Sequence, residues 1–292
     1  MSEISETDWM TGATLPWTVQ RVTDEGSAPE QIRIVLEEPL IIEINDERAA
    51  VLMRLPGWEK ELAVGFCVSE GLIANVEAIQ LVHHCGRGLP APEAPRQHIA
   101  RDEDSARASR NRVQIRVAAG AYRRAEAPDV VRLVRSGCGA VGVEVGDLDL
   151  PAVASRVQVS AQVLLSYNAA LRKRQELFHD VGGVHAAAIF DASGQLVAIQ
   201  EDIGRHNAVD KIIGYCLLRR IPVHDKAILT TGRTSYEMVS KAVRVGIPIV
   251  ASVSTPTALA VQIAEVYNCT LIGYMRANRF SIYTHPWRVL SE

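Results

Sequence analysis

A single cysteine, Cys138, stands between two glycines in the segment Arg-Ser-Gly-Cys-Gly-Ala-Val-Gly. Because Gly137 and Gly139 have no side chains, they leave the sulfur unshielded and let backbone N–H groups turn toward it, which favours a thiolate. Arg135 adds positive charge that lowers a thiol pKa. The segment therefore predicts a reactive cysteine. The alternative is that Cys138 is only a small apolar residue in a glycine-rich turn.

The remaining cysteines have other settings. Three lie in apolar patterns and are interpreted as core residues: Cys67, Cys216 and Cys269. Cys85 follows His83 and His84, a combination that can bind zinc. No second pair of ligands follows at a familiar spacing, so we predict no metal site.

Polar side chains crowd together between residues 181 and 211. Gly182-Gly-Val-His185 precedes one strand pattern, and Glu201-Asp-Ile-Gly-Arg-His-Asn-Ala-Val-Asp-Lys211 enters a helical one. His206 and Asp210 are four residues apart on one helical face, so the carboxylate could orient the imidazole. The segment either lines a pocket or forms a structural network of ion pairs.

Two turns have the composition of phosphate-binding turns. Thr230-Thr-Gly-Arg-Thr-Ser235 and Ser254-Thr-Pro-Thr257 each follow a predicted strand and precede a predicted helix. Free N–H groups and the helix dipole favour an anion there, and the carboxyl ends of neighbouring parallel strands are where open α/β sheets bind ligands. Helix capping alone would also explain the hydroxyl residues.

A third polar segment, Tyr274 to Arg279, leaves the last core strand with one aromatic ring and two arginines, Arg276 and Arg279. A guanidinium group can bind phosphate with two hydrogen bonds and stack on a base. This segment predicts a nucleotide contact, and the alternative is a solvated strand end.

The elements that position these residues follow from hydrophobic periodicity. After a long helix from Val159 to Phe178 and a hairpin around Asp191-Ala-Ser-Gly, helices and strands alternate, which indicates parallel strands with crossover helices. The predicted helices are 207–219, 236–245 and 257–267, and the predicted strands are 227–230, 248–253 and 270–274. We expect an α/β domain over residues 151–292.

The first half of the chain predicts a smaller α+β domain over residues 29–150. Its strand patterns are 32–36, 40–44 and 113–117, its helical patterns are 60–70 and around 130–134, and residues 86–112 have loop composition. Residues 1–28 lack apolar periodicity and are interpreted as a flexible tail.

The composition excludes several classes of protein. Hydrophobic residues make up 48% of the 292 residues and the formal net charge is −3, so no general nucleic-acid or membrane affinity is expected. The acidic start has no apolar core for a secretory signal, and no apolar run is long enough to span a membrane. An odd number of cysteines, five, argues against a disulfide framework. We expect a cytoplasmic protein.

Several long motifs resemble the FdhD family of formate dehydrogenase accessory sulfurtransferases. They are Gly182-Gly-Val-His-Ala-Ala-Ala, Glu201-Asp-Ile-Gly-Arg-His-Asn-Ala-Val-Asp-Lys and Thr231-Gly-Arg-Thr-Ser-Tyr-Glu-Met-Val. The resemblance covers nearly everything after the tail. It implies a cytidine-deaminase-like mixed sheet for residues 151–292, and a homodimer. Deaminase chemistry is not implied, because the His-x-Glu and Pro-Cys-x-x-Cys zinc motifs are absent.

The resemblance also implies a reaction. A persulfide sulfur from a cysteine desulfurase would be held by Cys138 and passed to the molybdenum of a bis(molybdopterin guanine dinucleotide) cofactor, for use by the formate dehydrogenase catalytic subunit. Val141 replaces the second cysteine of the family's loop, so we expect a one-cysteine relay.

The candidate cofactor-binding residues combine the three polar regions with the resemblance. They are His185, Asp202, Arg205, His206, Gly232, Arg233, Thr234, Ser235, Ser254, Thr257, Tyr274, Met275, Arg276, Ala277, Asn278 and Arg279. Two rival hypotheses stay open. The first is a non-catalytic carrier that presents the cofactor, and the second is a metal-dependent nucleotide hydrolase. The dehydrogenase served, and molybdenum as against tungsten, are not fixed by the sequence.

Overall fold

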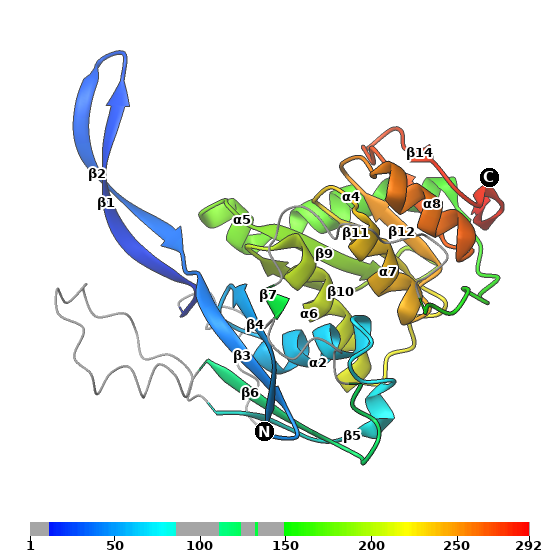
Figure 1. Ribbon diagram of the computed structural model, residues 1–292. Coiled ribbons are helices and arrows are strands. Elements are labelled where there is room, and N and C mark those ends of the chain that lie inside the picture. The colour runs from blue at the N-terminus through cyan, green and yellow to red at the C-terminus, as the bar shows by residue number, and fades with distance from the viewer. Residues whose placement is uncertain (1–11, 86–110, 124–131, 134–148, 292) are drawn as a thin grey trace.

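The computed structural model describes residues 12–85, 111–123, 132–133 and 149–291. Its larger part is a mixed sheet with helices on both faces (Figure 1). Strand order is β10-β9-β11-β12-β13-β14. The strands are β9 (His185–Phe190), β10 (Leu196–Asp202), β11 (Ala227–Thr230), β12 (Ile249–Ser252), β13 (Thr270–Gly273) and β14 (Ser281–Ile282).

The predicted alternation of strands and helices is confirmed. Strands β11, β12 and β13 are parallel, whereas β9, β10 and β14 pair antiparallel at the two sides. One face packs on α6 (Arg205–Leu218), α7 (Tyr236–Arg244) and α8 (Ala258–Val266), and the other on α4 (Ala161–Lys173). Successive residues of each strand point to opposite faces, so four-residue apolar strands such as Ala227–Thr230 fill both cores.

A second sheet forms the N-terminal part, with order β5-β6-β3-β4-β7. Its strands are β3 (Glu38–Ile44), β4 (Glu47–Arg54), β5 (Ile79–His84), β6 (Arg112–Val117) and β7 (Arg132–Leu133), with η1 (Val76–Ala78) before β5. Helix α2 (Glu59–Ser69) covers this sheet and packs with its other side against α6. The division of the chain near residue 150 stays a prediction.

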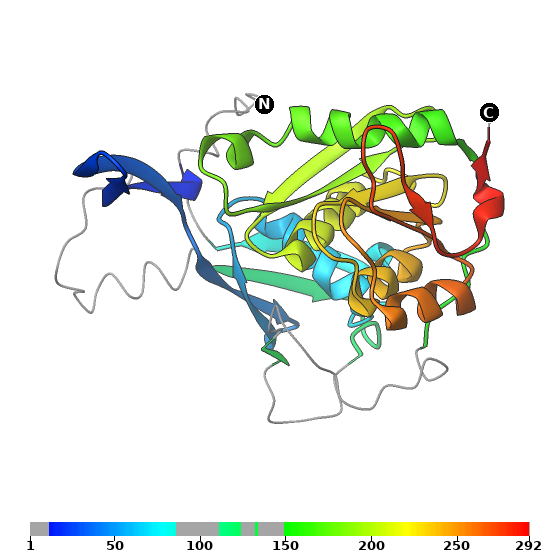
Figure 2. The same cartoon turned by 90° about the horizontal axis from the view of Figure 1, so that it is seen from above.

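Two glycines allow α2 and α6 to touch backbone to backbone. A Cβ atom built on Gly65 would lie 1.8 Å from the carbonyl oxygen of Asp210, and one on Gly214 would lie 1.9 Å from that of Glu61. Any larger residue would therefore force the helices apart. Figure 2 shows α2 between the N-terminal sheet and α6, so this crossing joins the two parts of the molecule.

The structure differs from the sequence prediction at three places. Residues 14–28, predicted within a flexible tail, belong to a hairpin of β1 (Thr14–Thr23) and β2 (Gly26–Val35). The predicted long helix is divided into β8 (Val159–Ser160), α4 and α5 (Glu176–Asp180), because Ser160 caps α4 and Gln175 leaves helical geometry. Arg132–Leu133, predicted helical, is a strand because it extends the sheet beside β4.

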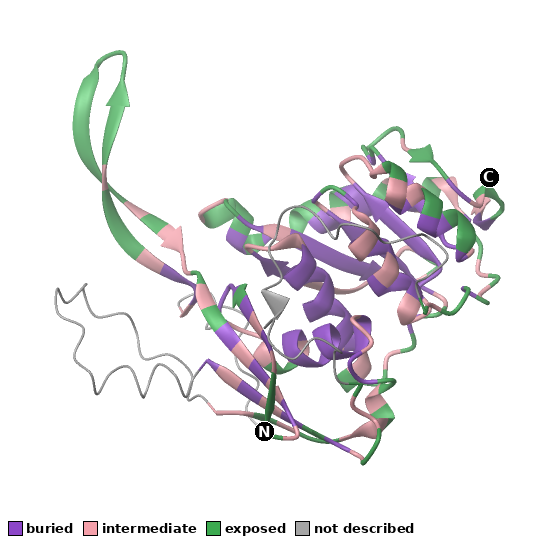
Figure 3. Cartoon of the chain, viewed as in Figure 1, coloured by how far each residue is buried: buried purple, intermediate pink, exposed green. Residues whose placement is uncertain are grey.

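The chain ends along the far side of the larger sheet. Helix η2 (Pro286–Arg288) leads to β15 (Val289–Leu290), which pairs with β8. The Arg288 guanidinium is buried and donates to the carbonyl oxygen of Ser155. Figure 3 shows that buried residues follow the sheet, α6 and α2, whereas most of the β1–β2 hairpin is exposed.

Candidate functional site

The two predicted phosphate turns lie side by side at the carboxyl ends of β11 and β12. The Thr234 N–H donates to the carbonyl oxygen of Thr255 at 3.3 Å, and the Thr257 N–H donates to that of Thr234 at 3.0 Å. The Ser252 hydroxyl donates to the Gly232 carbonyl oxygen at 2.6 Å. The turns therefore form one hydrogen-bonded unit. Thr257 caps α8 through its side chain, which confirms the capping alternative for that residue.

The third predicted segment completes this edge beyond β13. Tyr274 has a φ of 53°, and its N–H donates to the carbonyl oxygen of Ser254 at 2.8 Å. The Met275 N–H donates to that of Ser252, and its side chain points into the core. Arg276 donates to the carbonyl oxygen of Val253. Backbone contacts thus connect all three turns.

A surface hollow of about 310 Å³ opens beside this segment, lined by Tyr274, Arg276, Arg279, Phe280 and Ser281. The pairing of an aromatic ring with two guanidinium groups suits a base and a phosphate. Ala277 and Asn278 are exposed at the turn but do not line the hollow. Of the segment predicted from sequence, the structure brings together Tyr274, Arg276 and Arg279.

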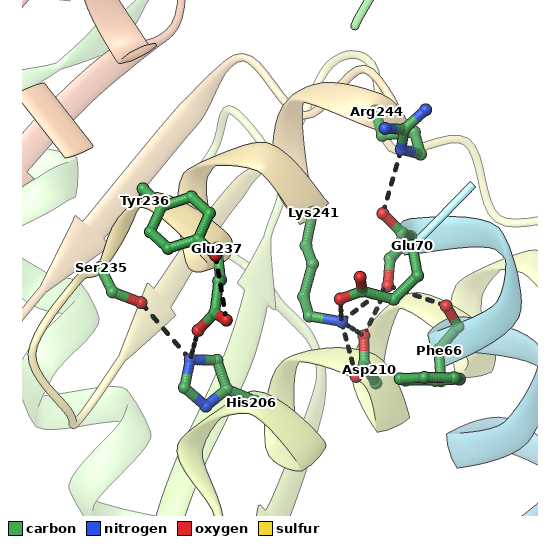
Figure 4. Close-up of polar contacts among 10 residues, drawn as sticks. Phe66, Glu70, His206, Asp210, Ser235, Tyr236, Glu237, Lys241 and Arg244 are labelled. Carbon is green, nitrogen blue, oxygen red and sulfur yellow. Dashed lines mark hydrogen bonds and ion pairs between the residues drawn. The ribbon is translucent and has the colours of Figure 1, made fainter. Parts of the chain in front are cut away.

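The first turns of α6 and α7 meet next to the β11 turn (Figure 4). His206 is buried, and its Nε2 lies 2.9 Å from Glu237 Oε2 and 3.4 Å from the Ser235 hydroxyl. The hydrogen bond from His206 lowers the pKa of Glu237 below its ordinary value. The imidazole and carboxylate are therefore held as a pair at two converging helix N-termini.

His185 and Arg205 flank the same turn. His185 Nδ1 lies 3.3 Å from the Thr231 hydroxyl, and a Cβ on Gly232 would lie 2.8 Å from Arg205 Cδ and 3.4 Å from His185 Nδ1. Only glycine lets both side chains approach this turn. Burial, followed by the charges of Arg205 and His206, lowers the pKa of His185, so its ring is neutral near pH 7.

Asp202 and Arg233 were both predicted to bind the cofactor, but one lies in the interior and the other at the surface. Asp202, predicted to bind cofactor, is completely buried: it lies 2.8 Å from Lys211 Nζ and accepts hydrogen bonds from Gly204, Asn207 and the Leu55 N–H. These contacts hold the start of α6 against the N-terminal part. Arg233, by contrast, is exposed at the tip of its turn.

The predicted pairing of His206 with Asp210 is wrong. Asp210 faces α2 and α7, where Lys241 Nζ lies 2.9 Å from its carboxylate and the Ser69 hydroxyl donates to it at 2.7 Å (Figure 4). Glu70 lies 2.6 Å from the same ammonium group. Burial by itself lowers the pKa of Lys241, but attraction to Asp210 and Glu70 outweighs it and raises the pKa. This half of the motif is a structural ion-pair network.

Sequence reasoning missed four residues of the edge and its surroundings: Glu237, Lys241, Phe280 and Ser281. Glu237 lies within the Thr231–Val239 motif, but its partner His206 is distant in sequence, so spacing gave no signal. Phe280 directly follows the predicted Arg279, and its aromatic ring was the signal available.

Cys138 lies outside the described residues. Among the described cysteines, Cys67, Cys216 and Cys269 are buried, as predicted. Burial raises the pKa of the Cys67 thiol, that of Cys216 to about 11 and that of Cys269 to about 12, so none forms a thiolate readily. Cys85 is partly exposed.

Within the described ranges, no group of three or more His, Cys, Asp and Glu side chains could hold a metal ion. In the same ranges, no helix combines the length and apolar character needed to cross a membrane.

The chain is similar to the members of one protein family over most of its length. Residues 35–290 match the model of the FdhD/NarQ family. The chain is 36% identical to the sulfur carrier protein FdhD of Sulfolobus acidocaldarius, over 93% of this chain and 96% of that one. It is 35% identical to that of Thermoplasma acidophilum, over 99% and 98%, and 35% identical to that of Nocardia farcinica, over 94% of each.

A solved structure has a similar fold. It is a crystal structure from Desulfotalea psychrophila described as a formate dehydrogenase accessory protein, with a TM-score of 0.71 and 23% identity. The match covers 95% of this chain and 100% of that one.

Proposed function

Because this chain belongs to the FdhD/NarQ family, we propose that it is a sulfur carrier for a formate dehydrogenase or a related molybdenum or tungsten enzyme. Its substrate would be the bis(molybdopterin guanine dinucleotide) cofactor, held by its nucleotide ends at the carboxyl edge of β11, β12 and β13. The carrying observation is the convergence there of Arg276, Arg279 and Tyr274 around one hollow.

The surroundings of the hollow support a diphosphate ligand. Arg205, Arg233, Arg276 and Arg279 bring positive charge to the three connected turns, and helices α6, α7 and α8 begin at the same edge. Glu237, in the first turn of α7, forms a pair with His206 at the same edge. His185 is neutral and can act as a hydrogen-bond donor.

Sulfur transfer needs a thiolate, so a cysteine that carries the sulfur must be able to deprotonate. Cys67, Cys216 and Cys269 are buried with raised pKa values, which leaves Cys138 and the partly exposed Cys85. In the proposed step, the Cys138 thiolate attacks the outer sulfur of a donor persulfide. A new S–S bond forms on Cys138, the donor S–S bond breaks, and the donor cysteine leaves as thiolate, so no net oxidation occurs.

The test is mass spectrometry after incubation with a cysteine desulfurase and cysteine. We expect a gain of about 32 Da, one sulfur atom, on Cys138. Cys85→Ala is the matched control and keeps the adduct, whereas Cys138→Ala loses it. An adduct confined to Cys85 contradicts the role of Cys138.

The alternative is a carrier that binds and presents the cofactor without transferring sulfur, and Val141 is the residue that favours it. Under this alternative, Cys138→Ala binds guanosine diphosphate normally and still supports full activation of formate dehydrogenase. Under the sulfur-carrier proposal, binding is normal and activation is lost. A homodimer and the cytidine-deaminase-like description of residues 151–292 remain predictions from the resemblance, and a cytoplasmic location remains a prediction from the composition.

A further inference from the structure

The carboxylate of Asp202 is saturated by groups of its own chain. Its Oδ2 lies 2.8 Å from Lys211 Nζ and accepts the Leu55 N–H at 3.2 Å. Its Oδ1 accepts the Gly204 N–H at 3.0 Å and the Asn207 amide at 2.9 Å. A carboxylate offers about four lone-pair sites, and Asp202 is completely buried. It therefore has no capacity left to bind a ligand directly, and any effect on the ligand site must pass through its partners.

Those partners belong to two parts of the molecule. Gly204, Asn207 and Lys211 lie at the beginning of α6, whereas Leu55 follows the last residue of β4 in the N-terminal part. Two further hydrogen bonds join the same segments. Lys211 Nζ donates to the Leu55 carbonyl oxygen at 3.0 Å, and the Asn207 amide donates to that of Met53 at 2.7 Å. The beginning of α6 is thus tied to the backbone at the end of β4.

The anchor point in the N-terminal part is itself held in place. Leu55 is completely buried in a small apolar cluster with Ala13, Leu177 and Val184. These three residues come from the segments before β1 and β9 and from α5. Because segments distant in sequence pack around Leu55, its backbone gives α6 a fixed reference position.

The residues at the other end of this tie belong to the candidate ligand site. Arg205 and His206 directly follow Gly204, so the direction of the first turn of α6 decides where their side chains lie. Gly204 is the N-cap of α6 and has no side chain with which to cap it, whereas Ser160 caps α4 through its hydroxyl group. Asp202 orients this helix start in place of a side-chain cap.

The side chains of Arg205 and His206 have little room for movement. His206 Nε2 lies 2.9 Å from Glu237 Oε2, and a Cβ on Gly232 would lie 2.8 Å from Arg205 Cδ. A rotation of α6 would therefore break the pair or press Arg205 against the turn after β11. Groups that bind a ligand must be held within about 0.5 Å of their productive positions, so the orientation of α6 affects binding.

We propose that Asp202 and Lys211 are positioning residues for the nucleotide end of the ligand. They hold Arg205 and His206 at the carboxyl edge of β11, β12 and β13, and they fix this arrangement to Leu55. The role rests on the proposed function, because the ligand is the diphosphate of a guanine nucleotide. Affinity for that ligand then depends on a buried pair that does not touch it.

The test compares two paired substitutions that involve the same helix. Asp202→Asn/Lys211→Met removes the positioning pair, and Asp210→Asn/Lys241→Met removes the interior pair with the same exchanges. Because both partners are replaced, neither variant keeps one of these buried charges without its partner, and both should fold. In isothermal titration calorimetry we expect the first to bind guanosine diphosphate about tenfold more weakly, and the second to bind within about twofold of the wild type.

A double-mutant cycle shows whether the loss passes through α6. In an Arg205→Ala background, one of the two positioned side chains is already absent, while the residues that line the hollow still bind the nucleotide. Adding Asp202→Asn/Lys211→Met to this background should weaken binding by clearly less than the tenfold expected in the wild type, by about threefold. A general loss of structure would instead give the same factor in both backgrounds.

Three outcomes overturn the positioning role. Wild-type affinity in Asp202→Asn/Lys211→Met does so and leaves the proposed function standing. An equal loss in Asp210→Asn/Lys241→Met does so too, because affinity would then follow stability. Absence of guanosine diphosphate binding to the wild-type chain overturns the proposed function and the positioning role together.

A milder variant keeps the test decisive if the first one does not fold. Asn207→Ala removes the amide that binds Asp202 and Met53 and leaves both charged residues in place. It should weaken binding of guanosine diphosphate by about threefold, and unchanged affinity in a folded protein overturns the positioning role.

Discussion

Helix α6 takes part in two regions of the molecule. In one, the charged side chains are paired with each other; in the other, several arginines are exposed to solvent. Toward its middle, Asp210 binds Lys241 and Ser69, and Glu70 binds the same Lys241, so the charges of this network are satisfied internally. At its N-terminus, it contributes to an edge where Arg233, Arg276 and Arg279 are exposed. There the Thr234 hydroxyl is buried and has no hydrogen-bond partner among the described residues. One continuous motif, Glu201–Lys211, supplies both regions.

The difference separates residues that hold the fold from residues available to a ligand. A buried charge needs a full set of partners, and the interior network supplies them. Arginines kept at the surface retain hydrogen-bonding capacity that another molecule can use. Density of charge in a sequence therefore does not by itself identify a binding site, and the partner of each group decides its role.

The largest effect should come from the glycines of the α2–α6 crossing. Gly65→Ala places a Cβ 1.8 Å from the Asp210 carbonyl oxygen, so the helices must separate. We expect a loss of more than about 4 kcal/mol in the free energy of unfolding, measured by urea denaturation, or failure to accumulate as folded protein. Lys60→Ala, on the exposed side of α2, should change stability by less than about 0.5 kcal/mol. Equal stability of the two variants would show that the crossing is not tight.

Breaking the interior network should be the next largest effect. Lys241→Met removes the ammonium group that pairs with Asp210 and Glu70 and leaves the buried Asp210 carboxylate without this cation, and should cost about 3–5 kcal/mol of unfolding free energy. Lys173→Met, at an exposed position, is the control. Adding Asp210→Asn should recover part of the loss. If the unfolding free energy falls by less than about 1 kcal/mol, the network contributes no more than an exposed surface ion pair.

A change at the carboxyl edge of β11, β12 and β13 should weaken nucleotide binding and leave stability unchanged. Arg279→Ala removes a guanidinium that lines the hollow, and should weaken binding of guanosine diphosphate by about tenfold with an unchanged melting temperature. Isothermal titration calorimetry measures the first quantity and differential scanning calorimetry the second. Arg156→Ala, a change of the same type outside the hollow, should leave affinity unchanged. Unaltered affinity in Arg279→Ala would remove this hollow from the nucleotide site.

The smallest effect should come from the pair of His206 and Glu237, which lies between the interior network and the exposed edge. His206 lowers the pKa of Glu237 below its ordinary value of 4.5, so the pair stabilises the fold above that pH, and the contribution is lost as pH falls through the lowered pKa. Glu237→Gln should therefore flatten the fall in unfolding free energy below about pH 4.5. Unfolding curves measured from pH 3 to pH 7 test this, and identical pH profiles would rule out a coupled pair.

The sequence predicted those features that depend on neighbours along the chain. Strands β11, β12 and β13 and their helices follow from local periodicity, and the arginines of Tyr274–Arg279 were identified from their spacing. The hairpin β1–β2 was missed because its apolar residues form a strip only when Trp17 and Ile32 pair across the turn.

Side-chain partners were the least predictable feature. The spacing of His206 and Asp210 allowed them to pair with each other. In the structure, His206 pairs instead with Glu237 and Asp210 with Lys241, both on α7. Such competition depends on how α6 and α7 pack, which no short segment of sequence specifies.

The hydrogen-bonded pairing of the two turns after β11 and β12 limits how this edge can evolve. Thr234 bonds to Thr255 and Thr257, so the register of the parallel strands continues through the turns. Inserting or deleting one residue in either turn would break the match with the other. We therefore expect related proteins to change residue types here and keep both turn lengths, while accepting length variation at the tip of the β1–β2 ribbon.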